Sequence, residues 1–228
     1  MLILFEDNHL LIYNKQPGDI VQGDKTGDEP LSEQLKGYIK EKYHKPGEVF
    51  LGVVHRIDRP VSGTVVFART SKALSRLNRM LKEGTMQKTY WAVVKQCPPT
   101  PSGKLVHYVT RNEKQNKTYV YNYEVPSGKR AELSYTLIAH SDRYYLLEVQ
   151  LATGRHHQIR AQLAHIGCPI KGDLKYGYPR SNPDGSIHLH ARRISFLHPV
   201  KNTPVTVEAS PPDEKVWNLF HPQEQKQP

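Results

Sequence analysis

The chain has 228 residues, of which 37% are apolar and 24% charged, so it can bury a hydrophobic core and is not a disordered chain. No apolar stretch approaches the length of a membrane span, residues 1–15 are too short and too acidic for a secretory signal, and two cysteines are too few for a disulfide framework. The 32 Lys and Arg residues against 22 Asp and Glu residues give a net charge of +10, which favours a polyanionic partner such as nucleic acid; a charge that only aids solubility is the alternative.

The first 54 residues predict a hairpin, a loop and a helix. Residues 3–15 contain two apolar segments around a short polar turn, which is the pattern of two paired strands. Residues 15–30 are rich in Gly, Pro and Asp and indicate a loop. A 3.6-residue period of apolar side chains predicts a helix from Pro30 to Tyr43, and a short apolar run follows at Val49–Val54.

The middle of the chain predicts mostly strands, with one helix between them. Residues 63–70 have the apolar character of a buried strand. Ser71 is placed to cap a helix that ends at Gly84. Residues 89–95 predict another strand, and residues 104–151 read as successive strands separated by turns.

The last third predicts one helix and a final pair of strands. The helix covers Arg155 to Ile166, and the strands cover residues 189–200 and 203–209. About three helices among many strands indicate an α+β fold, with a mixed, largely antiparallel central sheet flanked by helices and loops. We expect a single domain over residues 1–228, with a flexible tail at residues 220–228.

The densest polar cluster is the segment from His55 to Pro60, which lies between two apolar runs. Since such runs belong in the core, the polar segment is expected to emerge at a sheet edge or a cleft. The carboxylate of Asp58, flanked by Arg56 and Arg59, would be kept ionised and held in a fixed direction, as a nucleophile requires. The alternative is an Asp–Arg pair that only pins a loop, and on these residues alone the alternative is the commoner case.

A second basic cluster, from Gly154 to Arg160, opens the predicted helix after a strand. Helix N-termini attract anions, so this cluster could hold a phosphate or a catalytic carboxylate. The alternative is a basic first turn that faces solvent. Because cations are disfavoured at a helix start, arginines at this place indicate that a negative group lies nearby.

Tyr90 shares one face of its predicted strand with Ala92 and Val94. A tyrosine on an apolar face most often belongs to the core. The functional alternative is a ring that stacks on a base or a phenol that takes part in proton transfer.

The histidines raise the possibility of a metal site. His188 and His190 lie two residues apart on a predicted strand, while His156 and His157 are adjacent and Asp173 lies between the two pairs in the sequence. No face supplies three ligands at a recognised spacing, so hydrogen bonding in loops and contact with phosphate are the preferred interpretation.

Taken together, these segments resemble the successive signature motifs of the RluA-type pseudouridine synthases, in that family's order and with similar gaps. The resemblance extends from about residue 8 to about residue 210. Several matched motifs in order are far more specific than one alone. The segments that carry the resemblance are LLIYNKQPGDIVQGD, HRIDRPVSGTVVFART, KTYWAVV, GRHHQIRAQLAHIGCPIKGDLKYG and LHARRISFLHPV.

The resemblance implies the pseudouridine synthase fold and the isomerisation of uridine to pseudouridine within RNA. The family's catalytic aspartate falls on Asp58, its active-site tyrosine on Tyr90 and the arginine partner of the aspartate on Arg160. Arg56 falls on the arginine associated with filling the gap that an extruded base leaves. We expect further contacts with RNA from basic and polar residues near these motifs: His55, Arg59, Lys88, Arg155, His157 and Gln158.

Three departures from the family pattern leave the catalytic residues untouched: Ile57 stands where leucine is usual, the opening segment is one residue longer at Lys15–Gly18, and Cys168 stands where histidine is frequent. The extra S4-type RNA-binding domain of many relatives is expected to be absent. We expect no cofactor and no metal, a structured RNA partner such as a stem-loop of rRNA or tRNA, a monomer and a cytoplasmic location. Two alternatives are an inactive RNA-binding module and a metal-dependent hydrolase.

Overall fold

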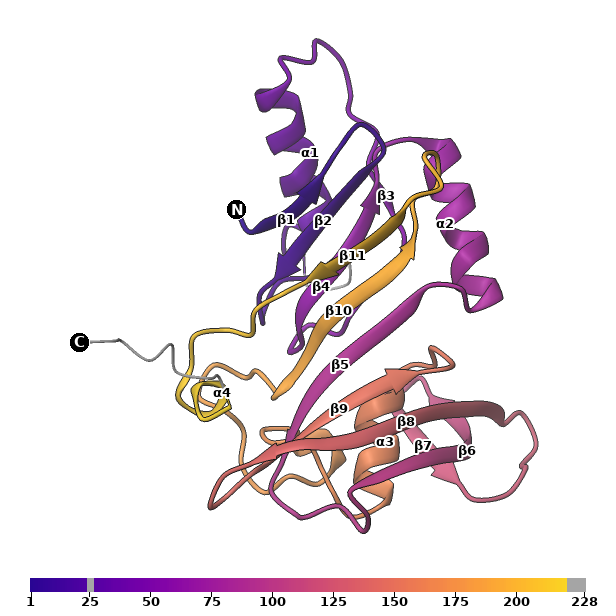
Figure 1. The fold of residues 1–228 in the computed structure, drawn as a ribbon, viewed down its shortest axis with the longest axis vertical. Helices are drawn as coiled ribbons and strands as arrows, with labels where there is room; N and C mark the ends of the chain where they lie inside the picture. The colour runs from indigo at the N-terminus through magenta and orange to yellow at the C-terminus, as the bar shows by residue number, and fades with distance from the viewer. Residues whose placement is uncertain (24–26, 221–228) are drawn as a thin grey trace.

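The computed structural model of the protein describes residues 1–23 and 27–220 (Figure 1). Residues 24–26 of the predicted loop, and the predicted tail from residue 221 onward, lie outside the described residues. The elements, in chain order, are β1 Ile3–Glu6, β2 Leu10–Lys15, α1 Leu31–Lys42, β3 Gly52–Val53, β4 Ser62–Ala68, α2 Ser71–Glu83, β5 Gln87–Val94, β6 Ser102–Asn112, β7 Lys117–Tyr121, β8 Lys129–His140, β9 Tyr145–Leu151, α3 Gln158–His165, the 3-10 turn η1 Leu174–Tyr176, β10 Leu189–Leu197, β11 Pro204–Glu208 and α4 Lys215–Asn218.

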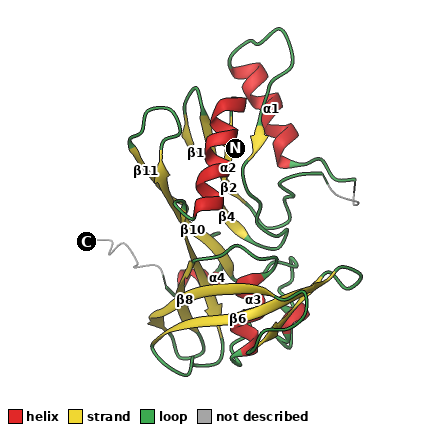
Figure 2. Cartoon of the chain, turned by 90° about the vertical axis from the view of Figure 1, so that its right-hand side faces the viewer, coloured by secondary structure: helices red, strands yellow, loops and turns green. Residues whose placement is uncertain are grey.

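One continuous sheet joins the strands of the described residues. Its order is β1-β2-β4-β10-β5-β9-β8-β6-β7, with β11 paired to β10 and β3 paired to β4. Among these pairings only that of β4 with β10 is parallel. The predicted α+β class with a mixed, largely antiparallel sheet is therefore confirmed, and Figure 2 shows the helices lying beside the sheet rather than alternating with its strands.

The first half of the sheet is covered on both faces, which explains why β4 is apolar throughout. Val66 packs with Ala73 and Leu77 of α2. The next residue, Phe67, points to the opposite face and packs with Leu35 of α1. Because both faces of β4 are buried, its sequence is a continuous apolar run and not an alternation of apolar and polar residues.

The second half of the sheet packs against α3 and α4. Tyr90, Ala92 and Val94 of β5 lie in one buried cluster with Leu163 of α3, so the prediction that these three residues share a face is confirmed. Val93 points to the other face and belongs to a small cluster with Trp217 of α4. Neither α4 nor the turn η1 is predicted by the sequence, since each spans about one turn and a helical period shows only over several turns.

Two helix starts differ from the prediction. Thr70, and not Ser71, is the N-cap of α2, because its extended backbone lets its side chain accept a hydrogen bond from the amide of Ala73 at 3.2 Å. The helix predicted from Arg155 begins at Gln158. His157 has a left-handed backbone (φ 49°), so the residues before it form a separate turn.

Candidate active site

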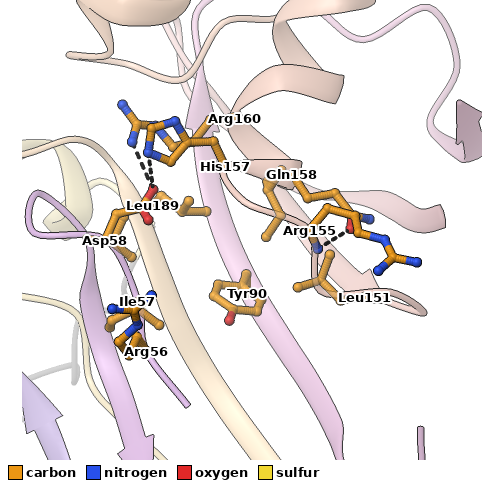
Figure 3. A pocket seen from close by; sticks show the side chains of 12 residues that line it. Arg56, Ile57, Asp58, Tyr90, Leu151, Arg155, His157, Gln158, Arg160 and Leu189 are labelled. Carbon is orange, nitrogen blue, oxygen red and sulfur yellow. Dashed lines mark hydrogen bonds and ion pairs between the residues drawn. The ribbon is translucent and has the colours of Figure 1, made fainter. Parts of the chain in front are cut away.

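A pocket lies where the two halves of the sheet meet, beside the N-terminus of α3 (Figure 3). It brings together the loop between β3 and β4, strand β5, the turn before α3 and the start of β10. All three predicted catalytic residues line it. Its full lining is Arg56, Ile57, Asp58, Val61, Tyr90, Leu151, Arg155, His157, Gln158, Ile159, Arg160 and Leu189.

A buried lysine holds the backbone of the loop that carries Asp58. The Lys15 side chain is 0% exposed, and its ammonium donates to the carbonyl oxygens of Arg59 at 3.1 Å and Gln16 at 2.8 Å. The amide of Gly18 donates to the same Arg59 carbonyl at 2.9 Å. Burial lowers the pKa of Lys15 to about 8. The opening segment of the chain therefore braces the Asp58 loop.

The other end of this loop is held by the parallel pairing of β4 with β10. A Cβ atom on Gly63 would lie 2.4 Å from the carbonyl oxygen of Ala191, and Gly63 has a φ of +116°. Only glycine permits this close approach. It brings Asp58 and Val61 beside Leu189, at the start of β10.

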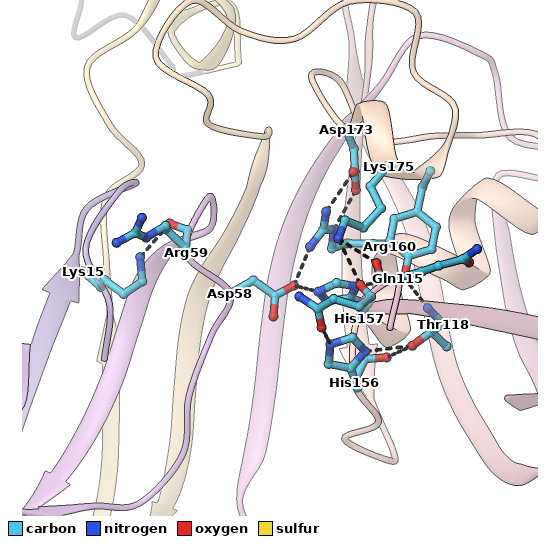
Figure 4. A network of polar contacts seen from close by, with 12 residues as sticks. Lys15, Asp58, Arg59, Gln115, Thr118, His156, His157, Arg160, Asp173 and Lys175 are labelled. Atoms are coloured by element: carbon cyan, nitrogen blue, oxygen red, sulfur yellow. Dashed lines mark hydrogen bonds and ion pairs between the residues drawn. The ribbon is translucent and has the colours of Figure 1, made fainter. Parts of the chain in front are cut away.

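Asp58 and Arg160 form an ion pair across 102 residues of sequence. Arg160 Nη1 donates to Asp58 Oδ2 at 2.8 Å, and the Asp58 side chain is 30% exposed to the pocket. The same guanidinium donates through Nε and Nη2 to the two carboxylate oxygens of Asp173, at 2.7 and 2.9 Å. Asp173 is 1% exposed, so it is a buried anchor that holds the guanidinium of Arg160 with Nη1 directed at Asp58 (Figure 4).

The negative group expected near the basic cluster at the start of α3 is present in the structure. Arg160 lies in the first turn of α3, where its charge is disfavoured, and the predicted negative group nearby is present as two carboxylates. Burial alone would lower the pKa of Arg160, but the pairs with Asp173 and Asp58 raise it overall. In the sequence, Asp173 stands out only as a possible metal ligand or a loop contact; the signal that could have singled it out is a lone acid between Lys171 and Lys175.

Tyr90 lies on the wall of the pocket, and its side chain is almost entirely buried. Burial raises the pKa of its phenol, and the negative charge of Asp58 raises it further. The phenol therefore stays protonated near neutral pH. This suits a ring that packs against a bound group better than a base that is already ionised.

The predicted RNA contacts fall into two groups. Arg56, Arg59 and Arg155 are exposed, and the first and last of these line the pocket. Gln158 is 3% exposed, and its amide bonds to Thr153, Glu132 and the backbone of Arg155, so it builds the turn before α3.

The remaining three predicted contacts are at least partly buried. His55 accepts a hydrogen bond from the amide of Val66 at 3.2 Å, and burial lowers its pKa to about 3. Lys88 is half-buried, and burial lowers its pKa too. His157 has both ring nitrogens near protein atoms: Nδ1 lies 2.9 Å from Tyr176 Oη, and Nε2 lies 3.3 Å from Asp58 Oδ2.

The histidines considered for a metal site lie in two places. His156 and His157 stack on each other at 3.7 Å beside the pocket. His188 and His190 both pack against Trp217, and His188 pairs with Glu214 at 2.8 Å. Within residues 1–23 and 27–220, no three His, Cys, Asp or Glu side chains are grouped to hold a metal ion, and no helix is long and apolar enough to cross a membrane.

The sequence matches a family model described as RNA pseudouridylate synthase over residues 9–165. It is 33% identical over 214 residues to the ribosomal large subunit pseudouridine synthase C of Vibrio vulnificus, covering 91% of this chain and 65% of that protein. It is 32% identical over 225 residues to the ribosomal large subunit pseudouridine synthase D of Xylella fastidiosa, covering 93% of this chain and 66% of that protein. The chain thus spans about two thirds of the length of these relatives.

The fold is similar to solved structures of human proteins. The structure of human RNA pseudouridylate synthase domain containing 4 superposes with a TM-score of 0.79 at 22% identity, covering 96% of this chain and 91% of that one. The structure of human RNA pseudouridylate synthase domain containing 1 gives a TM-score of 0.72, also at 22% identity, and covers 92% and 83% of the two chains.

Proposed function

Because the chain belongs to the RNA pseudouridylate synthase family, in the RluA-type branch that its motifs resemble, we propose that it converts uridine to pseudouridine in RNA. The observation that carries this proposal is the Asp58 carboxylate, held by Arg160 at the edge of a pocket that Tyr90 lines. Such a site offers an aimed, ionised oxygen beside an apolar wall.

The proposed reaction rearranges one nucleoside. The bond from N1 of uracil to C1′ of the ribose breaks, the base turns, and a bond forms from C5 to C1′. The hydrogen on C5 is lost, and N1 gains one. Substrate and product are isomers, so the stoichiometry requires no cofactor, metal or energy source.

Asp58 is the nucleophile, or the group that stabilises the cleaved sugar, and Arg160 pairs with it and orients it. Attack on the base and attack on C1′ both fit this role. Tyr90, with its phenol protonated, packs against the uracil. The pocket wall beside Asp58 also contains Ile57 and Leu189, which match the faces of a planar base.

The target uridine has to leave its stack to reach Asp58, at a cost of about a few kcal/mol. Arg56 is exposed at the pocket and could take the vacated place, while Arg155 and the net charge of +10 favour contact with phosphates. We propose a stem-loop of rRNA or tRNA as the substrate, since loop bases can be splayed out. A monomer in the cytoplasm, where Cys97 and Cys168 stay reduced, is the proposed working form.

The test is the release of tritium from RNA that carries 5-tritiated uridine. The wild type is expected to release tritium, and Asp58→Asn is expected to bind RNA as tightly yet release none. Asp142→Asn, which makes the same change in an exposed turn, is the matched control and should be fully active. Near-normal turnover by Asp58→Asn would show that Asp58 has another role. If the wild type binds RNA but releases no tritium, the inactive binding module is correct.

A further inference from the structure

A line of buried polar contacts runs from strand β7 to Asp58 (Figure 4). The backbone amide of Thr118 donates to Tyr176 Oη at 2.8 Å. Tyr176 Oη lies 2.9 Å from His157 Nδ1, and His157 Nε2 lies 3.3 Å from Asp58 Oδ2. The four residues come from β7, η1, the turn before α3 and the β3–β4 loop. The Tyr176 and His157 side chains are buried, so water does not replace these partners.

The groups around the His157 ring favour one of its two nitrogens as the one that carries the proton. Tyr176 Oη accepts the amide hydrogen of Thr118 and lies within hydrogen-bond distance of Nδ1 of His157. If the Tyr176 O–H donates to Nδ1, the ring proton lies on Nε2 and points toward Asp58. The opposite tautomer would set the Nε2 lone pair against the Asp58 carboxylate, two negative ends 3.3 Å apart. Electrostatics therefore favours the Nε2–H tautomer.

His157 is also kept uncharged. Burial lowers its pKa to about 2, and the nearby guanidinium of Arg160 acts in the same direction. The Asp58 carboxylate thus contacts one positively charged group, the guanidinium of Arg160, and one neutral group, the ring of His157. His157 has a left-handed backbone, which is rare for a residue other than glycine, at the point where its ring lies beside Asp58.

Both contacts with the Asp58 carboxylate meet at a single oxygen. Arg160 Nη1 and His157 Nε2 approach Oδ2 at 2.8 and 3.3 Å, from the third residue and the N-cap of α3. The hydrogen bond from Arg160 and the His157 ring beside it both restrain Oδ2, which leaves Oδ1 as the oxygen that is able to react. In a covalent adduct through Oδ1, Oδ2 becomes a carbonyl oxygen that the same two donors continue to bind.

We propose that His157 is a positioning residue of the isomerisation: with Arg160 it holds Oδ2 of Asp58, so that Oδ1 is presented to the uridine as the reacting oxygen. The inference rests on the proposed function. It differs from the sequence-based expectation that His157 contacts RNA. The contact of 3.3 Å is longer than the 2.8 Å hydrogen bond from Arg160, and the proposal requires that it close to a hydrogen bond when substrate is bound.

The first test compares three variants in tritium release and RNA binding. His157→Phe keeps the ring but removes the donor, and kcat is expected to fall about 10- to 100-fold while KM and RNA affinity stay within about twofold. His157→Gln restores a donor near Nε2 and recovers part of kcat. His165→Phe, an exposed histidine on the same helix, is the control and keeps wild-type kinetics.

Two results would overturn the proposal. A rise in KM with kcat unchanged in His157→Phe would assign His157 to RNA contact. A loss of stability with no change in kcat would make it a packing residue only.

A second measurement does not depend on activity. In ¹⁵N-histidine NMR of the free protein, His157 is expected as the neutral Nε2–H tautomer from pH 5 to pH 8, and Tyr176→Phe should disturb this state. An Nδ1–H tautomer or a charged ring would refute the inference. If the wild type releases no tritium from any RNA while the tautomer is as expected, the proposed function fails and the geometric premise stands.

Discussion

The buried anchor Asp173 allows a prediction whose size follows from the structure. Asp173→Asn keeps the shape of the side chain but removes its charge and puts an amide N–H₂ where one of two acceptor oxygens stood. Those oxygens now receive two charge-assisted hydrogen bonds from Arg160, and both residues are at most 5% exposed. Removing one partner of a buried pair costs about 3–5 kcal/mol.

We expect the lower end of that range, about 3 kcal/mol, because asparagine still offers one acceptor and Asp58 remains bound to Arg160. For a chain of this length, a loss of this size lowers the Tm by about 6–12 °C. Activity should also fall, since Arg160 is no longer aimed by two bonds at its far side.

The assay is thermal and urea unfolding of Asp173→Asn beside Glu208→Gln. Glu208 pairs with Arg192 and Arg193 but is 44% exposed at the side chain, so its loss should cost less than about 1 kcal/mol. A Tm for Asp173→Asn within about 2 °C of the wild type would refute the view that Asp173 anchors Arg160. Equal losses in the two variants would show that burial does not set the cost.

Three further outcomes are expected. Because burial lowers the pKa of Lys15 to about 8, the unfolded chain binds more protons than the folded chain between about pH 8 and 10.5. The free energy of unfolding of the wild type relative to Lys15→Met is therefore expected to rise across this window, by at most about 3 kcal/mol. Urea unfolding that shows no such rise would contradict the burial of Lys15. Thr70→Ala removes the N-cap of α2 and should lower the free energy of unfolding by about 1 kcal/mol, whereas Ser71→Ala should change it by much less. Equal effects of the two substitutions would contradict the assignment of Thr70 as the N-cap. Arg56→Ala should slow base extrusion, followed by the fluorescence of 2-aminopurine beside the target uridine, with unfolding unchanged; normal extrusion would assign Arg56 another role.

The sequence predicted the features that depend on one element at a time. The apolar run of β4, the shared face of Tyr90, Ala92 and Val94, and the helices α1 and α2 follow from side-chain periods of two or 3.6 residues. The α+β class follows from the kind and number of such elements. The unfavourable charge of Arg160 at a helix start even indicated that a negative group lies nearby, without saying which one.

Only the tertiary structure decided which residues meet. The pairing of Arg160 with Asp58 and with Asp173 depends on how α3 lies against the β3–β4 loop and the segment before η1, and no local period contains that information. Gln158 and His157 carried the polar signature of RNA contacts, yet both side chains are buried and bond to protein atoms. A side-chain period in the sequence describes one helix or strand at a time, whereas a site is formed by residues of elements that are distant in the sequence.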